Sequence, residues 1–162
     1  MLNPINLLSW NIKGASRTDS LCYLQKICYD NSVWLLALLE PMSNISQLEV
    51  VRHKLNFDHS TRFVDGRLLW ASELQLNFAE YADQLVHASV TFRLEVSFFL
   101  LVVYAKCTRV GGRPISDAME SIGAKINLSW IVVGDFNVIF MAEERIGGLP
   151  CQCLKYGGVQ FL

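Results

Sequence analysis

Polar side chains follow four apolar stretches of the sequence, and their types suit the binding of a hard cation. The stretches end at Trp10, Leu39, Val103 and Val133, and the polar residues that follow are Asn11, Glu40, Tyr104, Asp135 and Asn137. A side chain just past a buried strand emerges at the rim of its sheet, where α/β proteins bind ligands. Strand ends that share one edge would bring carboxylate, carboxamide and phenol groups together.

This set contains oxygen donors and neither Cys nor His, which favours Mg²⁺. Mg²⁺ keeps several waters and takes one or two carboxylates together with substrate phosphate. Asp135 and Asn137 are two residues apart, so on an extended backbone both side chains point to one side and Phe136 points to the core. The other three also fit simpler roles, as a turn residue, a solvated loop acid and a packed rim aromatic: Asn11, Glu40 and Tyr104.

Periodicity predicts the elements that position these residues. Short apolar runs predict buried strands at 5–10, 33–39, 98–103 and 130–133. Apolar residues at helical spacing predict helices at 19–30, 44–55 and 114–127, the last with Pro114 in its first turn. Asp65–Gly66 predicts a hairpin within 62–71.

Residues 85–97 alternate strictly, which predicts an antiparallel strand with one covered face. His87 lies on the polar face of this strand, and a bend or turn is expected near 93–95. The predicted class is therefore α/β, a layered sandwich with mixed and antiparallel strands.

Composition favours one globular domain over residues 1–162. Hydrophobic residues make up 52% and charged residues 18% of the chain, which excludes global disorder. A net charge of −1 excludes a general nucleic-acid coating role, because that needs excess Lys and Arg. Five irregularly spaced cysteines, no signal peptide and no membrane-length apolar run indicate an intracellular protein of the nucleus or cytoplasm, with no membrane contact.

Five segments carry a resemblance to a known family. They are SWNIKG at 9–14, LLEP at 38–41, VVYAK at 102–106, VVGDFNVI at 132–139 and EERIGG at 143–148. The first four occur in the order seen in the endonuclease/exonuclease/phosphatase superfamily. As a whole, the chain resembles the N-terminal endonuclease domain of a plant LINE-type, non-LTR retrotransposon. The resemblance implies a four-layer α/β sandwich of mixed and antiparallel sheets, here C-terminally incomplete.

The same resemblance implies Mg²⁺- or Mn²⁺-dependent cleavage of a phosphodiester bond in DNA. By motif match, Glu40 and Asn11 belong to the metal shell, and Asn11 also contacts phosphate. Asp135 orients or deprotonates the attacking water, and Asn137 positions phosphate. Tyr104 contacts the scissile phosphate or helps to stabilise the developing charge. A metal that polarises the phosphoryl oxygen and a carboxylate that activates water fit this chemistry.

A basic cluster follows Tyr104 and is a candidate for holding the DNA backbone: Lys106, Arg109 and Arg113. The alternative is a solvated surface loop. His53, His59 and His87 match no family motif and are expected to be structural or surface residues.

The sequence departs from the family pattern after the GDFN segment. The family site is completed by a later Asp and a terminal Ser-Asp-His motif, and no His follows His87 here. Loss of a group that acts in the transition state costs several powers of ten in rate, so we expect catalysis by this chain to be weak or nil. The alternatives are an inactive fragment or a remnant that binds nucleic acid or protein. A partner that supplies the missing half is a further expectation.

Overall fold

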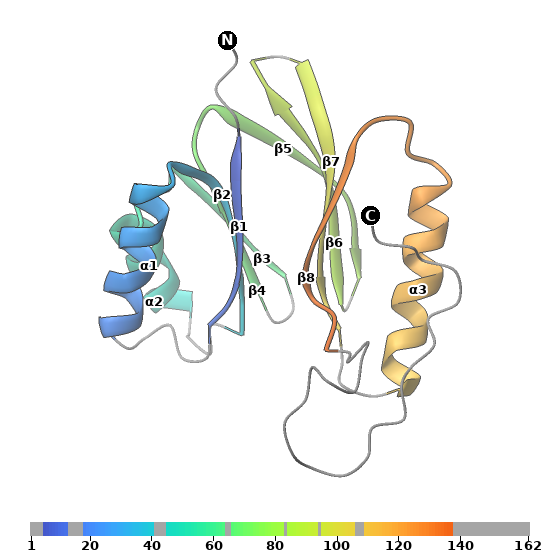
Figure 1. Cartoon of the computed structure of the whole chain (residues 1–162), viewed down its shortest axis with the longest axis horizontal. Coiled ribbons are helices and arrows are strands. Elements are labelled where there is room, and N and C mark those ends of the chain that lie inside the picture. Colours follow the sequence, from blue (N-terminus) through green and yellow to red (C-terminus); the bar gives the residue numbers. More distant parts are fainter. Residues whose placement is uncertain are drawn as a thin grey trace.

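The structure, a computed structural model, describes residues 5–12, 18–40, 45–63, 66–82, 84–93, 95–105 and 109–137. Within these ranges, eight strands form two four-stranded sheets, and three helices accompany them. Helices α1 and α2 cover the outer face of the first sheet, and α3 covers the outer face of the second (Figure 1). The layers are helix, sheet, sheet and helix, which confirms the predicted α/β sandwich.

The first sheet has the strand order β1-β2-β4-β3. Strands β1 and β2 are parallel and are joined by α1, while β4 is antiparallel to both of its neighbours. The elements of this half are β1 (Asn6–Asn11), α1 (Thr18–Asp30), β2 (Val33–Leu39), α2 (Ile45–Lys54), β3 (His59–Phe63) and β4 (Gly66–Trp70).

The second sheet has the order β5-β6-β7-β8. Its first three strands form an antiparallel meander, and β8 lies parallel to β7 after the crossover through α3. The elements are β5 (Leu74–Ala82), β6 (Leu85–Phe92), β7 (Glu95–Tyr104), α3 (Arg109–Gly123) and β8 (Trp130–Asp135). No strand among the described residues pairs with the outer edge of β1 or of β8, and these two edge strands lie on the same side of the sandwich (Figure 1).

Alternation along the strands divides the core into three clusters. The cluster between the sheets includes Leu35, Ala37 and Leu39 of β2, while Leu36 and Leu38 of the same strand pack under α1 and α2. The inward residues of β6 also join the cluster between the sheets, as the strict alternation of 85–97 predicts. The third cluster lies between the second sheet and α3 and contains Leu101, Val103, Ile115, Met119 and Ile122.

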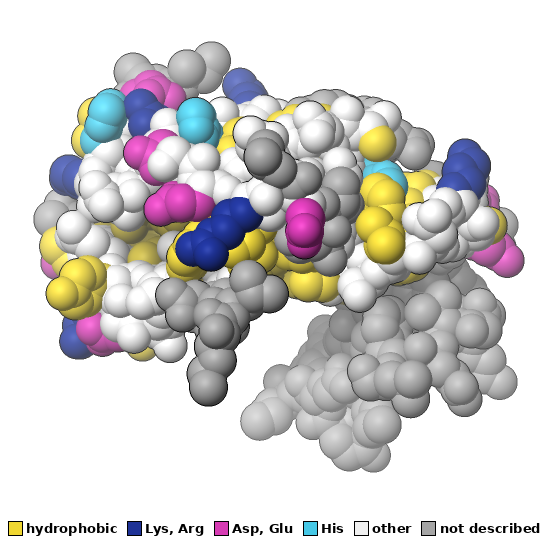
Figure 2. Space-filling view, turned by 90° about the horizontal axis from the view of Figure 1, so that it is seen from above, with side chains coloured by type: hydrophobic (Ala, Val, Ile, Leu, Met, Phe, Trp, Pro, Cys, Tyr) yellow, Lys and Arg dark blue, Asp and Glu magenta, His cyan; other side chains and the backbone are white. Residues whose placement is uncertain are grey.

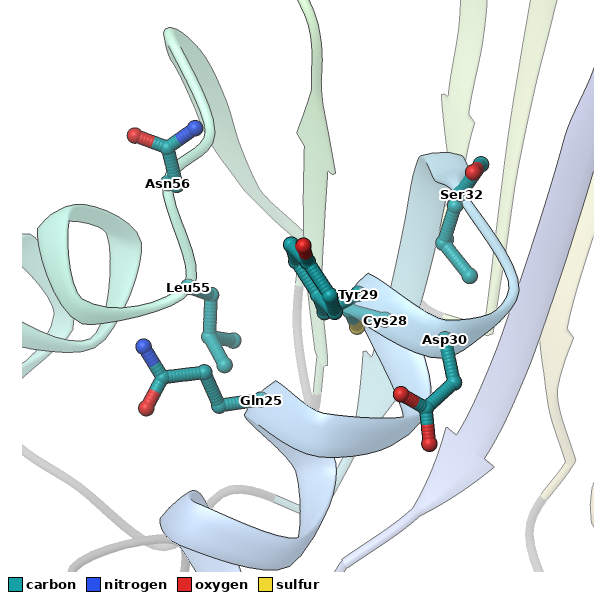
Figure 3. A pocket seen from close by; sticks show the side chains of 8 residues that line it. Gln25, Cys28, Tyr29, Asp30, Ser32, Leu55 and Asn56 are labelled. Carbon is teal, nitrogen blue, oxygen red and sulfur yellow. The ribbon is translucent and has the colours of Figure 1, made fainter.

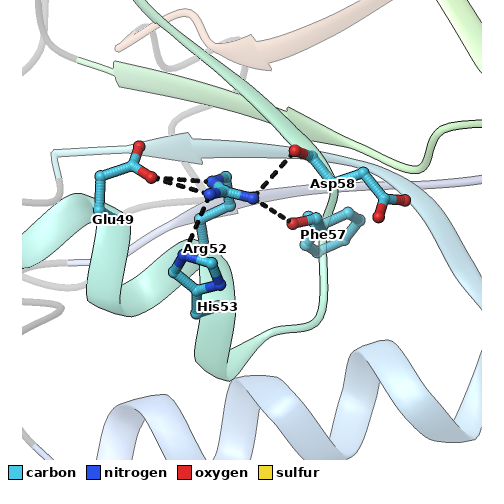
Figure 4. Close-up of polar contacts among 5 residues, drawn as sticks. All are labelled: Glu49, Arg52, His53, Phe57 and Asp58. Atoms are coloured by element: carbon cyan, nitrogen blue, oxygen red, sulfur yellow. Dashed lines mark hydrogen bonds and ion pairs between the residues drawn. The ribbon is translucent and has the colours of Figure 1, made fainter.

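The end of α2 is tied to the start of β3 by one arginine (Figure 4). Arg52 pairs with Glu49 at 2.9 Å and donates from Nη1 to the carbonyl oxygens of Phe57 and Asp58, both at 2.9 Å. Asp58 in turn accepts from the backbone N–H of Ser72 at 2.8 Å. Nearby, Figure 2 shows the end of the sandwich where β1 begins, with acidic, basic and hydrophobic side chains interspersed.

Some sequence predictions need correction. The third helix begins at Arg109 and ends at Gly123, so Pro114 lies beyond its first turn. Residues 98–103 are the second part of β7 rather than a separate strand, because the expected turn falls at Arg93, where φ is +51°. Strand β6 is covered on both faces and not on one as predicted, because α3 covers the outer face: His87 there is only 8% exposed and packs beside Phe99.

Strand β5 was not among the predicted elements. Its alternation of Leu74, Leu76 and Phe78 is a period-2 pattern, but an irregularity between Phe78 and Glu80 breaks it. In the predicted hairpin, Gly66 opens β4, while Val64 and Asp65 lie outside the described residues.

Glycine at position 134 allows β7 and β8 to come together just before Asp135. Its φ is +140°, and a Cβ atom there would lie 1.9 Å from the carbonyl oxygen of Val103. That oxygen belongs to the backbone of the neighbouring strand and cannot rotate away. Position 134 of β8 therefore requires a residue without a side chain.

We predict that Gly134→Ala lowers the free energy of unfolding by at least about 2 kcal/mol, because it combines backbone strain with overpacking. Urea denaturation followed by circular dichroism measures the change. Gly123→Ala is the control, since its Cβ would lie 3.2 Å from the far end of the Trp130 ring. Its effect should stay within about 1 kcal/mol. Equal effects of the two substitutions would contradict this account of Gly134.

Candidate functional site

The candidate site lies where β1, β2, β7 and β8 end, at the lower end of the sandwich in Figure 1. In the parallel pair β1–β2, Asn11 is the register partner of Leu39, which precedes Glu40. In the parallel pair β7–β8, Tyr104 is the register partner of Asp135. Parallel pairing therefore aligns the carboxyl ends of two strands in each sheet, as the sequence analysis expected of strands that share an edge.

A hydrogen bond between the two sheets joins Asn11 to Asp135. Asn11 donates from Nδ2 to Oδ2 of Asp135 at 2.6 Å, over a separation of 124 residues. The other carboxylate oxygen of Asp135 accepts from the backbone N–H of Asn137 at 2.8 Å. Two donors on two different oxygens fix the plane of this carboxylate.

A second contact across the sheets joins Tyr104 to Glu40. The phenol O–H of Tyr104 donates to Oε1 of Glu40, and both side chains are half-buried. Glu40 has a φ of +52°, so the backbone leaves the extended conformation directly after β2. Because Tyr104 and Asp135 are register partners, the two contacts lie next to each other at one rim.

Asn137 differs from its prediction. Strand β8 ends at Asp135, and Asn137 has a φ of +49°, so the two residues are not on one extended backbone. Its side chain donates from Nδ2 to the carbonyl oxygen of Ala105 at 2.6 Å, which braces the segment after β8 against the end of β7. Phe136 points toward α3 and packs in the cluster there, so its inward orientation was predicted correctly.

The residues present fit a hard cation. Two carboxylates and one carboxamide lie at the rim, and Mg²⁺ binds through one or two carboxylates while it keeps water and takes substrate phosphate. Among the described residues, no group of three or more His, Cys, Asp and Glu side chains is placed to hold a metal. A softer metal that needs a closed protein cage, such as structural zinc, has no such cage in this part of the chain.

The basic cluster is only partly visible. Lys106 lies outside the described residues. Arg109 and Arg113 belong to α3, which follows β7, and their side chains lie outside the described part. The cluster therefore stays a prediction.

Sequence reasoning did not predict the hollow of about 810 Å³ at the far end of α1 (Figure 3). Its labelled lining residues come from the ends of α1 and α2 and the turns after them: Gln25, Cys28, Tyr29, Asp30, Ser32, Leu55 and Asn56. Burial raises the pKa of the Cys28 thiol to about 11, so the thiol is protonated and unreactive at neutral pH. The hollow has no activated nucleophile and lies away from the strand ends that form the candidate site.

No family model and no curated protein sequence matches this chain. Solved structures do. An endonuclease/exonuclease/phosphatase family protein from Bacteroides thetaiotaomicron matches with a TM-score of 0.56 and 13% identity, over 83% of this chain and 62% of its own. The endonuclease domain of TRAS1, a telomere-specific non-LTR retrotransposon, matches with a TM-score of 0.58 and 12% identity, over 84% and 60%.

An AP endonuclease from Archaeoglobus fulgidus matches with a TM-score of 0.60 and 12% identity, over 86% of this chain and 60% of its own. The chain thus spans about 60% of the length of these three structures. At such identities the likeness concerns the fold: this chain has the α/β sandwich fold of the endonuclease/exonuclease/phosphatase superfamily. Among the described residues, no helix is long and apolar enough to cross a membrane.

We predict that Asn11 and Asp135 are energetically coupled. In a double-mutant cycle of Asn11→Ala, Asp135→Ala and the double variant, the coupling energy should be about 1 kcal/mol in favour of the native pair, as for a hydrogen bond to a charged group near the surface. Urea denaturation of the four proteins gives this value. Asn11→Ala with Glu73→Ala is the control pair, because Glu73 follows β4 at the other end of the sheet. Coupling as small as in the control pair would contradict the contact.

We further predict that Cys28 resists alkylation. With a thiol pKa of about 11, only about 0.1% of Cys28 is thiolate at pH 8, and it is buried, so exposed Cys22 should react first with iodoacetamide. Trypsin cleaves at Lys26 between the two, so mass spectrometry reports each thiol separately. Unfolding in urea should make Cys28 react. Equal rates in the folded protein would contradict the burial.

Proposed function

We propose that this protein is a divalent-metal-dependent phosphodiester hydrolase that acts on DNA, of the endonuclease type found in non-LTR retrotransposons. The single observation that carries the proposal is the pair of contacts across the sheets, Asn11 with Asp135 and Tyr104 with Glu40. They join a base, a candidate metal ligand and two hydrogen-bonding groups at one rim. The sandwich fold shared with endonucleases supports the same class of reaction.

Each residue has a role that follows from its contacts. Asp135 is the base that takes a proton from the attacking water, because two N–H donors fix its carboxylate plane and leave further lone pairs on both oxygens. The carboxylate of Glu40 and the side-chain oxygen Oδ1 of Asn11 would hold Mg²⁺ or Mn²⁺. When bound, this cation would neutralise charge on the phosphoryl oxygens. Tyr104, whose O–H lies beside Glu40, orients that carboxylate and is placed to contact phosphate.

Asn137 takes a different part from the one expected from its motif. One N–H of its side-chain amide donates to the carbonyl oxygen of Ala105, and its backbone N–H donates to Asp135. We therefore assign it first to holding the Asp135 carboxylate in place. Its Nδ2 carries two N–H groups, so the one that does not bond Ala105 is the donor with which the side chain would contact phosphate.

DNA as the substrate is supported by charge and by likeness. Lys106, Arg109 and Arg113 follow the strand that carries Tyr104, and cationic side chains beside a hydrolytic site bind backbone phosphates. The TRAS1 domain, which has the same fold, is a retrotransposon endonuclease.

The second candidate function is binding of DNA without cleavage. None of the three histidines lies at the site. His53 near the end of α2 and His59 at the start of β3 lie at the other end of the sandwich, and His87 lies on the outer face of the second sheet. Without an imidazole to protonate the leaving group, the described residues favour weak hydrolysis. Among the described strands, none pairs with the outer edge of β1 or of β8. This proposal therefore includes a further segment, for example from a partner, that pairs with these edges.

A plasmid-nicking assay with the purified chain tests the proposal. We predict slow nicking with Mg²⁺ that stops with EDTA and falls at least about 100-fold in Asp135→Ala and Glu40→Gln. Glu73→Gln is the matched control, since it removes an exposed carboxylate at the other end of the sandwich and should leave the rate unchanged.

Circular dichroism of each variant shows that the loss is not unfolding. Nicking that persists in folded Asp135→Ala would overturn the assigned base. A folded wild-type chain that binds DNA and does not nick it would establish the second candidate function in place of hydrolysis.

A further inference from the structure

A buried arginine lies on the helix-covered face of the first sheet, near the candidate site. Arg67 of β4 is only 6% exposed. Its Nη1 donates to the carbonyl oxygen of Gly66 at 2.6 Å and, at the limit of bonding, to that of Phe63 at 3.5 Å. Its Nε is buried and has no hydrogen-bond partner among the described residues. Burying a guanidinium with an unused donor is costly unless an anion is bound to it.

A second arginine faces it across the strand pair. Arg62 of β3 is exposed and is the register partner of Arg67, so the two Cβ atoms lie about 5 Å apart. Burial, and then the charge of Arg62, lower the pKa of Arg67. Arginine nevertheless stays protonated in proteins, so two positive charges share one small area, an arrangement that destabilises a sheet.

No described carboxylate neutralises this pair. Between described side chains, the ion pairs are Lys26 with Asp30 and Arg52 with Glu49, and neither includes Arg62 or Arg67. Arg52 of α2, which packs on the same sheet, differs from Arg67 because its guanidinium donates to the carboxylate of Glu49 and to two carbonyl oxygens (Figure 4). An anion that binds between the two guanidinium groups would remove the repulsion.

The arginine pair lies at the end of the sheet where the candidate site is. Arg67 is the register partner of Leu38, two residues before Glu40, and neighbouring strands are about 4.8 Å apart. Helix α2 starts at this end too, since it begins at Ile45 after β2 and leads to His59, which lies at the opposite end of the sheet. The positive end of its dipole therefore adds to the field of the two arginines.

We propose that Arg62 and Arg67 form a binding subsite for a backbone phosphate of DNA, a few nucleotides from the bond held at Glu40 and Asp135. The proposal rests on the proposed function for the identity of the polymer. Duplex DNA carries a phosphate about every 3.4 Å of axis on each strand, so a strand held at Glu40 presents further phosphates within a few nucleotides of the cleaved bond. The planar guanidinium fork suits two oxygens of one phosphate.

Salt-dependent binding of a labelled 20-base-pair duplex, measured by fluorescence anisotropy in EDTA, tests the subsite without cleavage. The slope of log K against log salt concentration is negative, and loss of one phosphate contact lowers its magnitude by about 1. We expect this change in Arg62→Gln, together with a severalfold weaker affinity at low salt. Arg93→Gln is the control, because Arg93 is exposed and contacts the ring of Phe92, with 4.9 Å to the ring centroid, in the other sheet.

Arg67→Gln should lower the slope in the same way and should not lower the urea midpoint, since it removes a buried unpaired charge. Should Arg67→Gln fail to fold, Arg62→Gln decides, because its side chain is exposed. A slope in Arg62→Gln equal to that in Arg93→Gln and wild type would overturn the subsite. Asp135→Asn separates the subsite from the proposed function, because it should abolish nicking and leave the salt slope unchanged. If the arginine variants change the slope and the wild type does not nick DNA, the subsite stands and only the hydrolase assignment is lost.

Discussion

Face-to-face packing of the two sheets is the interaction on which the site depends. Within the described residues, β1 pairs only with β2 and β8 only with β7, so no backbone hydrogen bond links the strand of Asn11 to that of Asp135. The buried cluster between the two sheets holds them face to face. The hydrophobic effect that drives this packing is non-directional. The contacts of Asn11 with Asp135 and of Tyr104 with Glu40 are directional, so they align the two sheets at the rim where the site lies.

Much of this site follows from local sequence, because Asn11, Tyr104 and Asp135 each end a strand and Glu40 directly follows one. The run before Asp135 is a buried strand, and the glycine at 134 fits its close approach to β7. The choice of partners does not follow from local sequence. Asn11 bonds across to the second sheet and not to Glu40 in its own sheet, and that choice depends on how two sheets pack.

The wrong predictions have identifiable causes. Asn137 was assigned to an extended backbone, but its left-handed conformation lets its N–H cap the carboxylate of Asp135, which is a property of turns. The strict alternation of 85–97 was expected to leave one face uncovered, but His87 on that face is buried beside Phe99, which the pattern of one strand does not reveal. The arginine pair of β3 and β4 was not predicted, because which residues face each other depends on the register of the two strands.

The long sequence separation of the contacts across the sheets has a consequence for the order of folding. The hairpins β3–β4, β5–β6 and β6–β7 close short loops and cost little chain entropy, whereas the bond from Tyr104 to Glu40 spans 64 residues and that from Asn11 to Asp135 spans 124. Contacts of such separation form after local pairs have shortened the chain between them. The rim is therefore expected to acquire its geometry last, so a nascent or partly folded chain would hold complete hairpins before it holds a site.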